Sequence, residues 1–208
     1  MFNLLTDELP ETVDVAGKEC PVRWTYQHII KVEQALNDAN QSEEDRILLA
    51  LSLFYEEEIP GDIKAAIEAM YGFLSRSKPL SRAQKAAQER HRTDLPSCDY
   101  DHDDDLIYAA FMQVYGIRLA RVDGLHWYEF NALLSGLDDC PFTRVRGWRE
   151  KDLAKVKDAK ERAQYAELKA YWALPESEAQ QAYTDALEDA LLNGGDIGAF
   201  IEGRRYDV

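Results

Sequence analysis

The residues best suited to chemistry lie together in the run CDYDHDDD at positions 98–105, which holds five aspartates, one histidine and one cysteine. Aspartates at the alternating positions 99, 101, 103 and 105 resemble the oxygen ligands of a calcium loop. An EF-hand loop also needs a glycine at its sixth position and a glutamate at its twelfth. Counted from Asp99, these positions hold Asp104 and Ala110, so the run does not fit this motif.

A transition-metal site is the second chemistry that this run suggests, because Cys98 and His102 could both be ligands. No second pair of Cys or His residues stands at a spacing that would complete a tetrahedral site. We therefore predict that the carboxylates of residues 99–105 are solvated and cap the start of a helix. Recognition of a charged partner is the alternative, and a metal-dependent enzyme that uses Asp99–Asp105 is a weaker one.

Other patterns typical of catalysis do not occur in the sequence. The four histidines show no HxxH or HExxH spacing, and there is no glycine-rich phosphate loop and no G-x-S-x-G nucleophile motif. Nothing in the sequence brings a cysteine and a histidine together as a nucleophile pair. The sequence therefore predicts a protein that is not an enzyme and that has no catalytic residue, metal or cofactor.

Two helices are predicted to position the acidic run and to nucleate the core. Asp103 or a neighbouring aspartate can cap the first helix, and Gly116 stands where a C-terminal glycine stop belongs. Apolar residues recur at helical spacing in each helix, which predicts one buried face on each. These residues are Ile107, Ala110, Phe111 and Val114 in the first helix, and Trp127, Phe130, Leu134 and Leu137 in the second.

The whole chain is predicted to be mainly α, a compact bundle of about six to eight helices with a small N-terminal β-hairpin. The hairpin should turn at Ala16–Gly17–Lys18. The helix near 43–55 is apolar almost all round and is expected to be central and buried. Asp62 should cap the helix that follows, and Phe142 and Val145 should face inward from a short helix. Further helices are expected over 26–36, 63–74, 151–174 and 175–193.

We predict four segments along the chain. Residues 1–75 form the N-terminal hairpin and helices, and residues 76–98 form a basic linker with few large apolar side chains. Residues 99–150 form a central helical core that packs on residues 1–75. Residues 151–208 form charged C-terminal helices and a flexible tail.

Charge and cysteine content limit the class of partner. The chain carries 39 acidic and 24 basic residues, a formal net charge of −15, which disfavours binding to nucleic acid or to an anionic membrane and would suit a basic partner. The lysines between 151 and 162 alternate with acids, so we expect a solvated helix face there. Three isolated cysteines and the lack of a long apolar run predict a soluble cytoplasmic protein.

The predicted helix over 151–174 has few apolar anchors for its length, which is typical of a helix that protrudes or pairs with another molecule. We therefore expect a partner-binding surface there. The candidate residues are Trp148, Tyr165, Leu168, Tyr171 and Trp172.

Several segments in order resemble one family, the bacteriophage gene-product-15-type family of long-tailed phages that infect Gram-positive bacteria. These segments are NLLTDELP at 3–10, LSLFY at 51–55 with IP at 59–60, YAAF at 108–111 with YGI at 115–117, LHW at 125–127, DLAKVKD at 152–158 and ALP at 173–175.

The resemblance implies a non-enzymatic tail assembly protein, a chaperone that coats the tape measure protein and then gives way to the major tail protein. It also implies self-association into oligomers, a place in the cytoplasm of the infected bacterial host, and absence from the mature virion. A structural tail or connector component that stays in the virion is the alternative.

Overall fold

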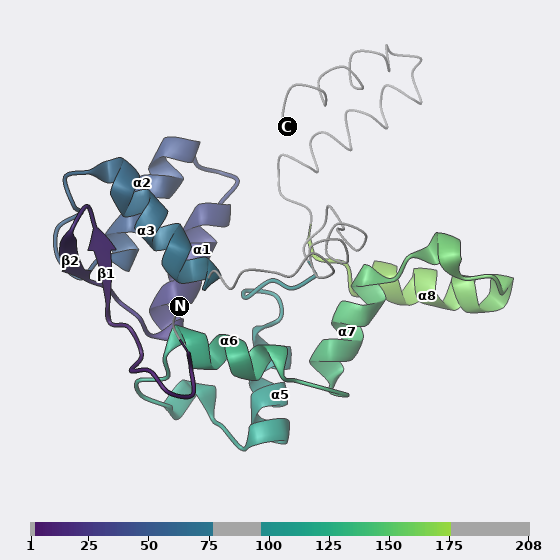
Figure 1. Cartoon of the computed structure of the whole chain (residues 1–208). Coiled ribbons are helices and arrows are strands. Elements are labelled where there is room, and N and C mark those ends of the chain that lie inside the picture. Colours follow the sequence, from purple (N-terminus) through teal and green to yellow (C-terminus); the bar gives the residue numbers. More distant parts are fainter. Residues whose placement is uncertain (1–2, 77–96, 176–208) are drawn as a thin grey trace, which may run out of the picture. The chain divides into compact units, whose positions relative to one another are not determined.

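The computed structural model describes residues 3–76 and 97–175 (Figure 1). Over these residues the chain forms seven α-helices and one two-stranded sheet, which confirms the prediction of a mainly α bundle with a small hairpin. Of the described residues, 3–37, 43–76 and 97–174 belong to one compact unit. The helices are α1 (Tyr26–Asn37), α2 (Glu43–Phe54), α3 (Ile63–Ser75), α5 (Asp104–Tyr115), α6 (Trp127–Ser135), α7 (Pro141–Glu150) and α8 (Ala159–Tyr171), with short 3₁₀ turns η1 (Leu119–Arg121) and η2 (Leu153–Lys155).

The hairpin consists of β1 (Thr12–Val15) and β2 (Lys18–Pro21), which pair antiparallel with Val15 opposite Lys18. Its turn uses Ala16 at φ 51° and Gly17 at φ 85°, the pair of positive φ angles that a two-residue hairpin turn requires. The predicted turn position is therefore confirmed. Because a two-stranded ribbon is not stable alone, it needs a surface to pack on, and β1 lies against α3.

Phe130 of α6 lies at the centre of the aromatic core. Its ring stacks on Tyr26 of α1 at 4.7 Å between centroids, on Phe111 of α5 at 5.2 Å and on Trp127 at 5.9 Å. These contacts join α1 to α5 and α6, which lie far from α1 in the sequence. The predicted packing of the Ile107–Phe111 stripe against the Trp127–Phe130 stripe is confirmed, since Ile107, Phe111, Trp127 and Phe130 are all buried.

The start of α1 is tied to the start of α6 through the backbone. The amide of Tyr26 donates to the carbonyl of Leu125, and the amide of Trp127 donates to the carbonyl of Trp24. His126 caps α6, because its Nδ1 accepts from the amide of Tyr128 at 3.0 Å and its Nε2 donates to the carbonyl of Pro10 at 3.0 Å. His126 thereby joins the N-terminal segment, α1 and α6 at one point.

Three expectations about individual helices were wrong. Helix α2 is not buried all round: Ala50, Leu51 and Phe54 face the core, whereas Leu48 and Leu49 are exposed. Val114 on α5 is also exposed, because α5 packs on its neighbours through the face that carries Ile107, Ala110 and Phe111. Residues 151–174 do not form one helix, since Asp152 caps η2 and Asp158 caps α8, which splits the segment in two.

Other local predictions are confirmed. Asp62 caps α3 by accepting from the amide of Ala65 at 3.0 Å. Gly116 ends α5 at φ 68°, and Phe142 and Val145 of α7 are buried. The predicted helix over 175–193, the tail and most of the linker lie outside the described residues, and the division into four segments stays a prediction. Within residues 3–76 and 97–175, none of the helices has the length and apolar character needed to span a membrane.

Candidate partner-binding site

Helix α8 and the end of α7 carry the five residues proposed from the sequence to bind a partner. Asp158 starts α8 by accepting from the amide of Glu161 at 2.8 Å. No residue of α8 is buried, whereas each of the other six α-helices described buries at least two. Helix α8 therefore offers most of its surface to solvent within this chain.

The structure brings three of the four aromatic candidates together at the C-terminal end of α8. Trp148 lies 6.3 Å from Trp172 between ring centroids, and Tyr171 meets Trp172 edge-on at 5.2 Å. Tyr171 is 79% exposed, while Trp148 and Trp172 are half-buried. These three rings form the aromatic cluster of the α7–α8 region.

The other two candidates, Tyr165 and Leu168, are half-buried. The ammonium group of Lys151 lies 4.4 Å from the ring centroid of Tyr165, which is within the range of a cation–π contact. Lys169 donates to the carbonyl of Lys151 at 3.1 Å. Tyr165 is therefore partly engaged in holding α8, whereas Tyr171 is available to a partner.

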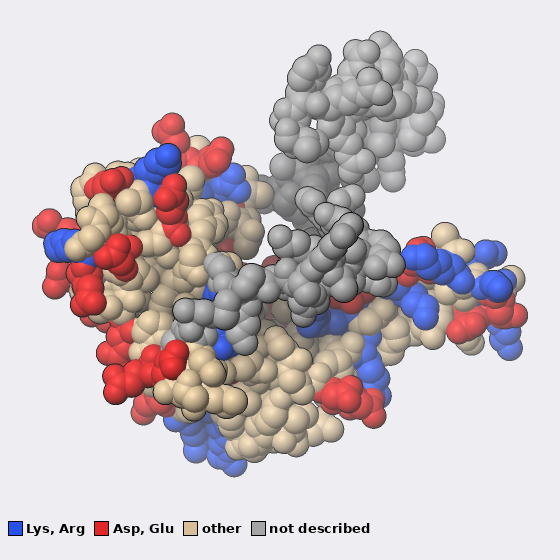
Figure 2. All heavy atoms as spheres, viewed as in Figure 1, with Lys and Arg blue, Asp and Glu red and all other residues tan. Residues whose placement is uncertain are grey.

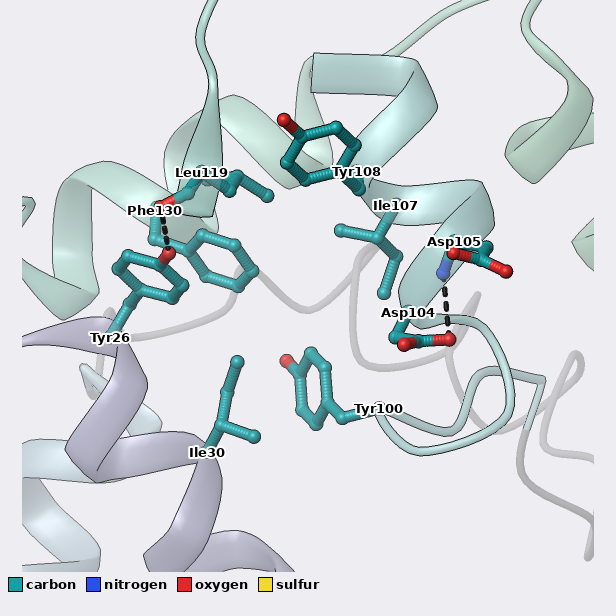
Figure 3. A pocket seen from close by; sticks show the side chains of 9 residues that line it. All are labelled: Tyr26, Ile30, Tyr100, Asp104, Asp105, Ile107, Tyr108, Leu119 and Phe130. Atoms are coloured by element: carbon teal, nitrogen blue, oxygen red, sulfur yellow. Dashed lines mark hydrogen bonds between the residues drawn. The ribbon is translucent and has the colours of Figure 1, made fainter. Parts of the chain in front are cut away.

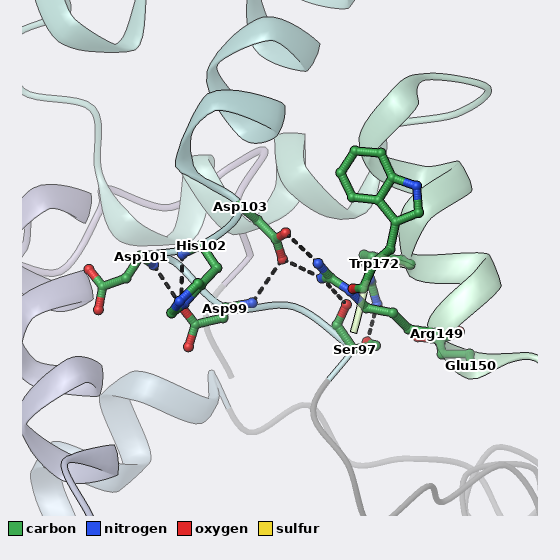
Figure 4. A network of polar contacts seen from close by, with 9 residues as sticks. Ser97, Asp99, Asp101, His102, Asp103, Arg149, Glu150 and Trp172 are labelled. Carbon is green, nitrogen blue, oxygen red and sulfur yellow. Dashed lines mark hydrogen bonds and ion pairs between the residues drawn. The ribbon is translucent and has the colours of Figure 1, made fainter. Parts of the chain in front are cut away.

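Arg149, the next-to-last residue of α7, fixes α8 and α5 to each other (Figure 4). Its guanidinium group makes two parallel hydrogen bonds to Asp103, from Nη1 to Oδ2 at 2.6 Å and from Nη2 to Oδ1 at 2.8 Å. Its Nε donates to the carbonyl of Trp172 at 2.6 Å, and Nη1 also donates to the carbonyl of Ser97 at 3.2 Å. One cation, whose side chain is 9% exposed, therefore links the N-terminus of α5, the C-terminus of α8 and the backbone at Ser97.

The expectation that all the aspartates of residues 99–105 are solvated was wrong for Asp103. Its side chain is fully buried, occupies the N-cap position of α5 without making a side-chain cap bond, and pairs with Arg149 instead. The sequence contained one usable signal: Asp103 lies four positions before Ile107 and seven before Ala110, in phase with the buried stripe. Arg149 could not be found in this way, because it is 46 positions from its partner.

The remaining acids of the run behave as expected of solvated carboxylates. Asp99 accepts from the amides of Asp101 and His102 at 2.8 and 3.0 Å. Burial raises the pKa of Asp99, but the hydrogen bonds from His102 and Asp101 outweigh it, so the pKa lies below its ordinary value. The arrangement is a turn that leads into α5.

Metal or thiol chemistry has little support at this run. Burial raises the pKa of Cys98 to about 12, which keeps the thiol protonated at neutral pH, and a protonated thiol is a poor nucleophile and a poor metal ligand. Among residues 3–76 and 97–175, no group of three or more His, Cys, Asp or Glu side chains is placed to hold a metal ion.

Charged side chains of both signs alternate over α8 in the face shown in Figure 2. Lys155 and Asp152 pair at 2.9 Å just before this helix, and both are exposed. This mixed surface matches the interleaved lysines and acids seen in the sequence. It has no single sign that would attract nucleic acid.

Comparison with known proteins identifies a family. A family model described as Bacteriophage Gp15 protein matches residues 5–174, which include every helix and strand described above. No curated protein and no solved structure matches the chain.

Proposed function

The chain belongs to the Bacteriophage Gp15 protein family, and from this membership we propose that it is a non-enzymatic tail assembly protein, a chaperone of the tape measure protein. In this role it binds the long helical tape measure in the cytoplasm of the infected host. It then gives way to the major tail protein and is left out of the mature virion.

The exposed state of α8 is the observation that supports this proposal. A tape measure is a long helix that presents apolar stripes before the tail tube encloses it. A chaperone for such a client needs contacts that form readily and can be displaced, which favours a small surface with a few aromatic anchors. Tyr171 is almost fully exposed beside Trp148 and Trp172, on a helix that buries none of its residues.

The client surface is proposed to include Trp148, Tyr165, Leu168, Tyr171 and Trp172. Tyr171 is the anchor, because its side chain is 79% exposed whereas the other four are half-buried. The proposed role also requires self-association. Several copies bound along one client would place these surfaces in a row.

Co-expression of the full chain with tape measure fragments tests the proposal. Wild-type protein should retain fragments in a pull-down, and Tyr171→Ala should weaken retention at least about tenfold, as expected for an aromatic anchor. Tyr71→Ala is the matched control, since Tyr71 is an exposed tyrosine on α3. Failure of the wild-type chain to retain any fragment would count against the chaperone role.

Mass spectrometry of purified virions separates the chaperone from a structural tail or connector component. A chaperone should be absent from virions but present in lysates of infected cells. Stoichiometric amounts in the virion would contradict the proposal and favour the structural component.

A further inference from the structure

A pocket opens between α1, α5 and α6 (Figure 3), and none of the residues that line it belongs to the aromatic cluster of α7–α8. Its volume is about 250 Å³, which is below the usual size of a site for a drug-sized molecule and suits a single long side chain. Four aromatic rings contribute to its lining, and two carboxylates lie beside them. These residues are Tyr26, Tyr100, Tyr108 and Phe130, with Asp104 and Asp105.

The aromatic walls are preformed. Tyr26 stacks on Phe130 at 4.7 Å, and its hydroxyl donates to the carbonyl of Leu119 at 2.8 Å, which holds the ring in place. Tyr100 lies 6.3 Å from Phe130 between ring centroids. Within the described part of the chain, the hydroxyls of Tyr100 and Tyr108 have no hydrogen-bond partner. Tyr26 and Phe130 are buried and stacked on other rings, so the half-buried Tyr100 and the exposed Tyr108 are the rings whose faces can attract a cation.

The charge beside these rings is negative. Asp104 and Asp105 form the first turn of α5, and one oxygen of Asp104 accepts from the amide of Asp105 at 2.8 Å. Neither carboxylate forms an ion pair with a cation of residues 3–76 or 97–175. Two full negative charges exceed the partial positive charge of about +0.5 at a helix N-terminus, so the rim favours a cation.

Other charged groups near the pocket add to its negative charge. Glu33 of α1 acts electrostatically on Tyr100, and Asp101 is held by the side chain of Gln34. Arg146 also acts on Tyr100, but its guanidinium group faces Glu150 and Ser97 and lies over the ring of Phe142. The pocket is thus apolar on its walls and acidic at one side.

We propose that this pocket binds a lysine or arginine side chain of a partner peptide. The aliphatic stem of such a side chain packs against the rings, while the charged end reaches Asp104 and Asp105. The acidic chain, with a net charge of −15, steers a basic partner toward it. This inference is independent of the proposed role of α8, because the two surfaces share no residue.

An exposed apolar ridge continues from the pocket along α5. Tyr108 lines the pocket and is itself exposed, and Met112 follows it on the same face of the helix. A partner segment would therefore place its basic residue in the pocket and an apolar residue over Met112. The recognised chemistry is a basic residue with an apolar residue close to it in the partner segment.

Titration of the full chain with short peptides, followed by amide NMR, tests the proposal. The probes are acetyl-Ala-Ala-X-Ala-Ala-amide with arginine, lysine, norleucine or glutamate at X, added up to ~20 mM because a contact through one side chain is expected in the millimolar range. The arginine and lysine peptides should shift the signals of Tyr100, Asp104 and Tyr108. The norleucine and glutamate peptides should bind at least about threefold more weakly or not at all.

Variants identify the charges and rings responsible. Asp104→Asn with Asp105→Asn should weaken binding of the arginine peptide about three- to tenfold, and Tyr108→Leu about two- to fivefold. Glu43→Gln with Glu44→Gln is the matched control, because these exposed acids occupy the same first turn of α2. It should leave binding unchanged, and salt should weaken binding to the wild-type chain.

The proposal is overturned by any of three results. One is equal binding of the norleucine and arginine peptides, which would make the pocket an apolar anchor site. Another is an equal effect of the α2 control and the α5 variant, which would make the attraction non-specific. The last is the absence of shifts near the pocket with either basic peptide, in wild-type protein whose spectrum is that of a folded chain.

Discussion

Helices α6 and α8 are held in place by opposite means. Helix α6 buries Trp127, Tyr128 and Phe130, and its aromatic rings contact residues of α1, α3 and α5. Helix α8 buries no residue and is held by the guanidinium of Arg149, a cation–π contact and the Trp148–Trp172 pair.

The difference indicates a division of stability within one chain. Burial of apolar surface is non-directional and accumulates over many contacts, so α6 can be released only when the core opens. A few directional polar contacts hold α8, and losing one of them should free α8 while the core stays folded. The region proposed to meet the client is therefore the region that opens at lower free energy.

Removing the central ring of the core should have the largest effect. Phe130→Ala deletes stacking with Tyr26, Phe111 and Trp127, and we expect a loss of about 3–5 kcal/mol in the free energy of unfolding. Urea denaturation measures this loss, and hydrogen exchange should show lower protection in both α6 and α8. Tyr171→Ala, an exposed aromatic control, should change stability by less than about 0.5 kcal/mol. A loss below about 1 kcal/mol for Phe130→Ala would contradict the central role of this ring.

Removing Arg149 should cause the second largest loss of stability, and this loss should be distributed differently between α6 and α8. Arg149→Met leaves the fully buried Asp103 without its cation, which typically costs about 3 kcal/mol or more. Hydrogen exchange should show that α8 loses protection before α6 does. Combining Arg149→Met with Asp103→Leu should recover much of the loss, because no buried charge is then left unpaired.

A matched surface pair provides the control for this prediction. Arg144 and Asp139 approach to 3.5 Å and are both exposed, so Arg144→Met should cost less than about 1 kcal/mol. If Arg149→Met lowers protection in α6 and α8 equally, the two regions form one cooperative unit and the proposed division is wrong.

Lowering the pH should destabilise the core through the titration of His126. Burial lowers the pKa of this imidazole below 6.5, against smaller opposing effects of Pro10, Glu129 and Glu11. Between 6.5 and the lower folded pKa, the unfolded chain binds a proton that the folded chain does not, so stability falls as pH falls, by at most about 1.4 kcal/mol per pH unit. Urea denaturation at several pH values between 7.5 and 5 would measure this dependence as a free energy of unfolding that falls with pH, with a slope no steeper than that limit.

The variant His126→Asn isolates this group, because asparagine can still cap a helix but does not titrate. Its stability should depend less on pH over the same interval. A pH dependence identical to that of the wild-type chain would assign the effect to another group.

The helix caps give the smallest and most discriminating comparison. Asp62 caps α3 and Asp158 caps α8 with similar geometry, at 3.0 and 2.8 Å, and either change to alanine should cost its helix about 1 kcal/mol. For Asp62→Ala the loss should appear in global unfolding, because α3 buries Met70 and Phe73. For Asp158→Ala it should appear in hydrogen exchange of α8 alone. A global loss for Asp158→Ala would show that α8 unfolds together with the core.

Local signals predicted the elements well. The cap at Asp62, the stop at Gly116 and the hairpin turn at Gly17 were all predictable, because each depends on a backbone requirement that only a few residue types meet. The face of α2 was harder, since Leu48 and Leu49 are as apolar as the buried Leu51. Composition alone cannot tell which side of such a helix meets the core.

Long-range polar contacts were beyond the sequence. The Asp103–Arg149 pair depends on how α5 and α7 cross, and that crossing is set by side chains elsewhere in both helices. The phase of Asp103 within the apolar stripe could have indicated burial, but not the identity of the partner. The pocket beside Asp104 was missed for the same reason, because its walls come from three helices and two connecting segments.

The bond between His126 and the carbonyl of Pro10 spans 116 positions of the chain. A ribosome adds about 5–20 residues per second, so roughly 6–23 s pass between synthesis of Pro10 and synthesis of its partner. During this interval the start of α1 also lacks the carbonyl of Leu125 to accept from the amide of Tyr26. Pro10 and the start of α1 therefore reach their final contacts only after residue 126 has been made, and a product truncated before residue 126 would lack these contacts.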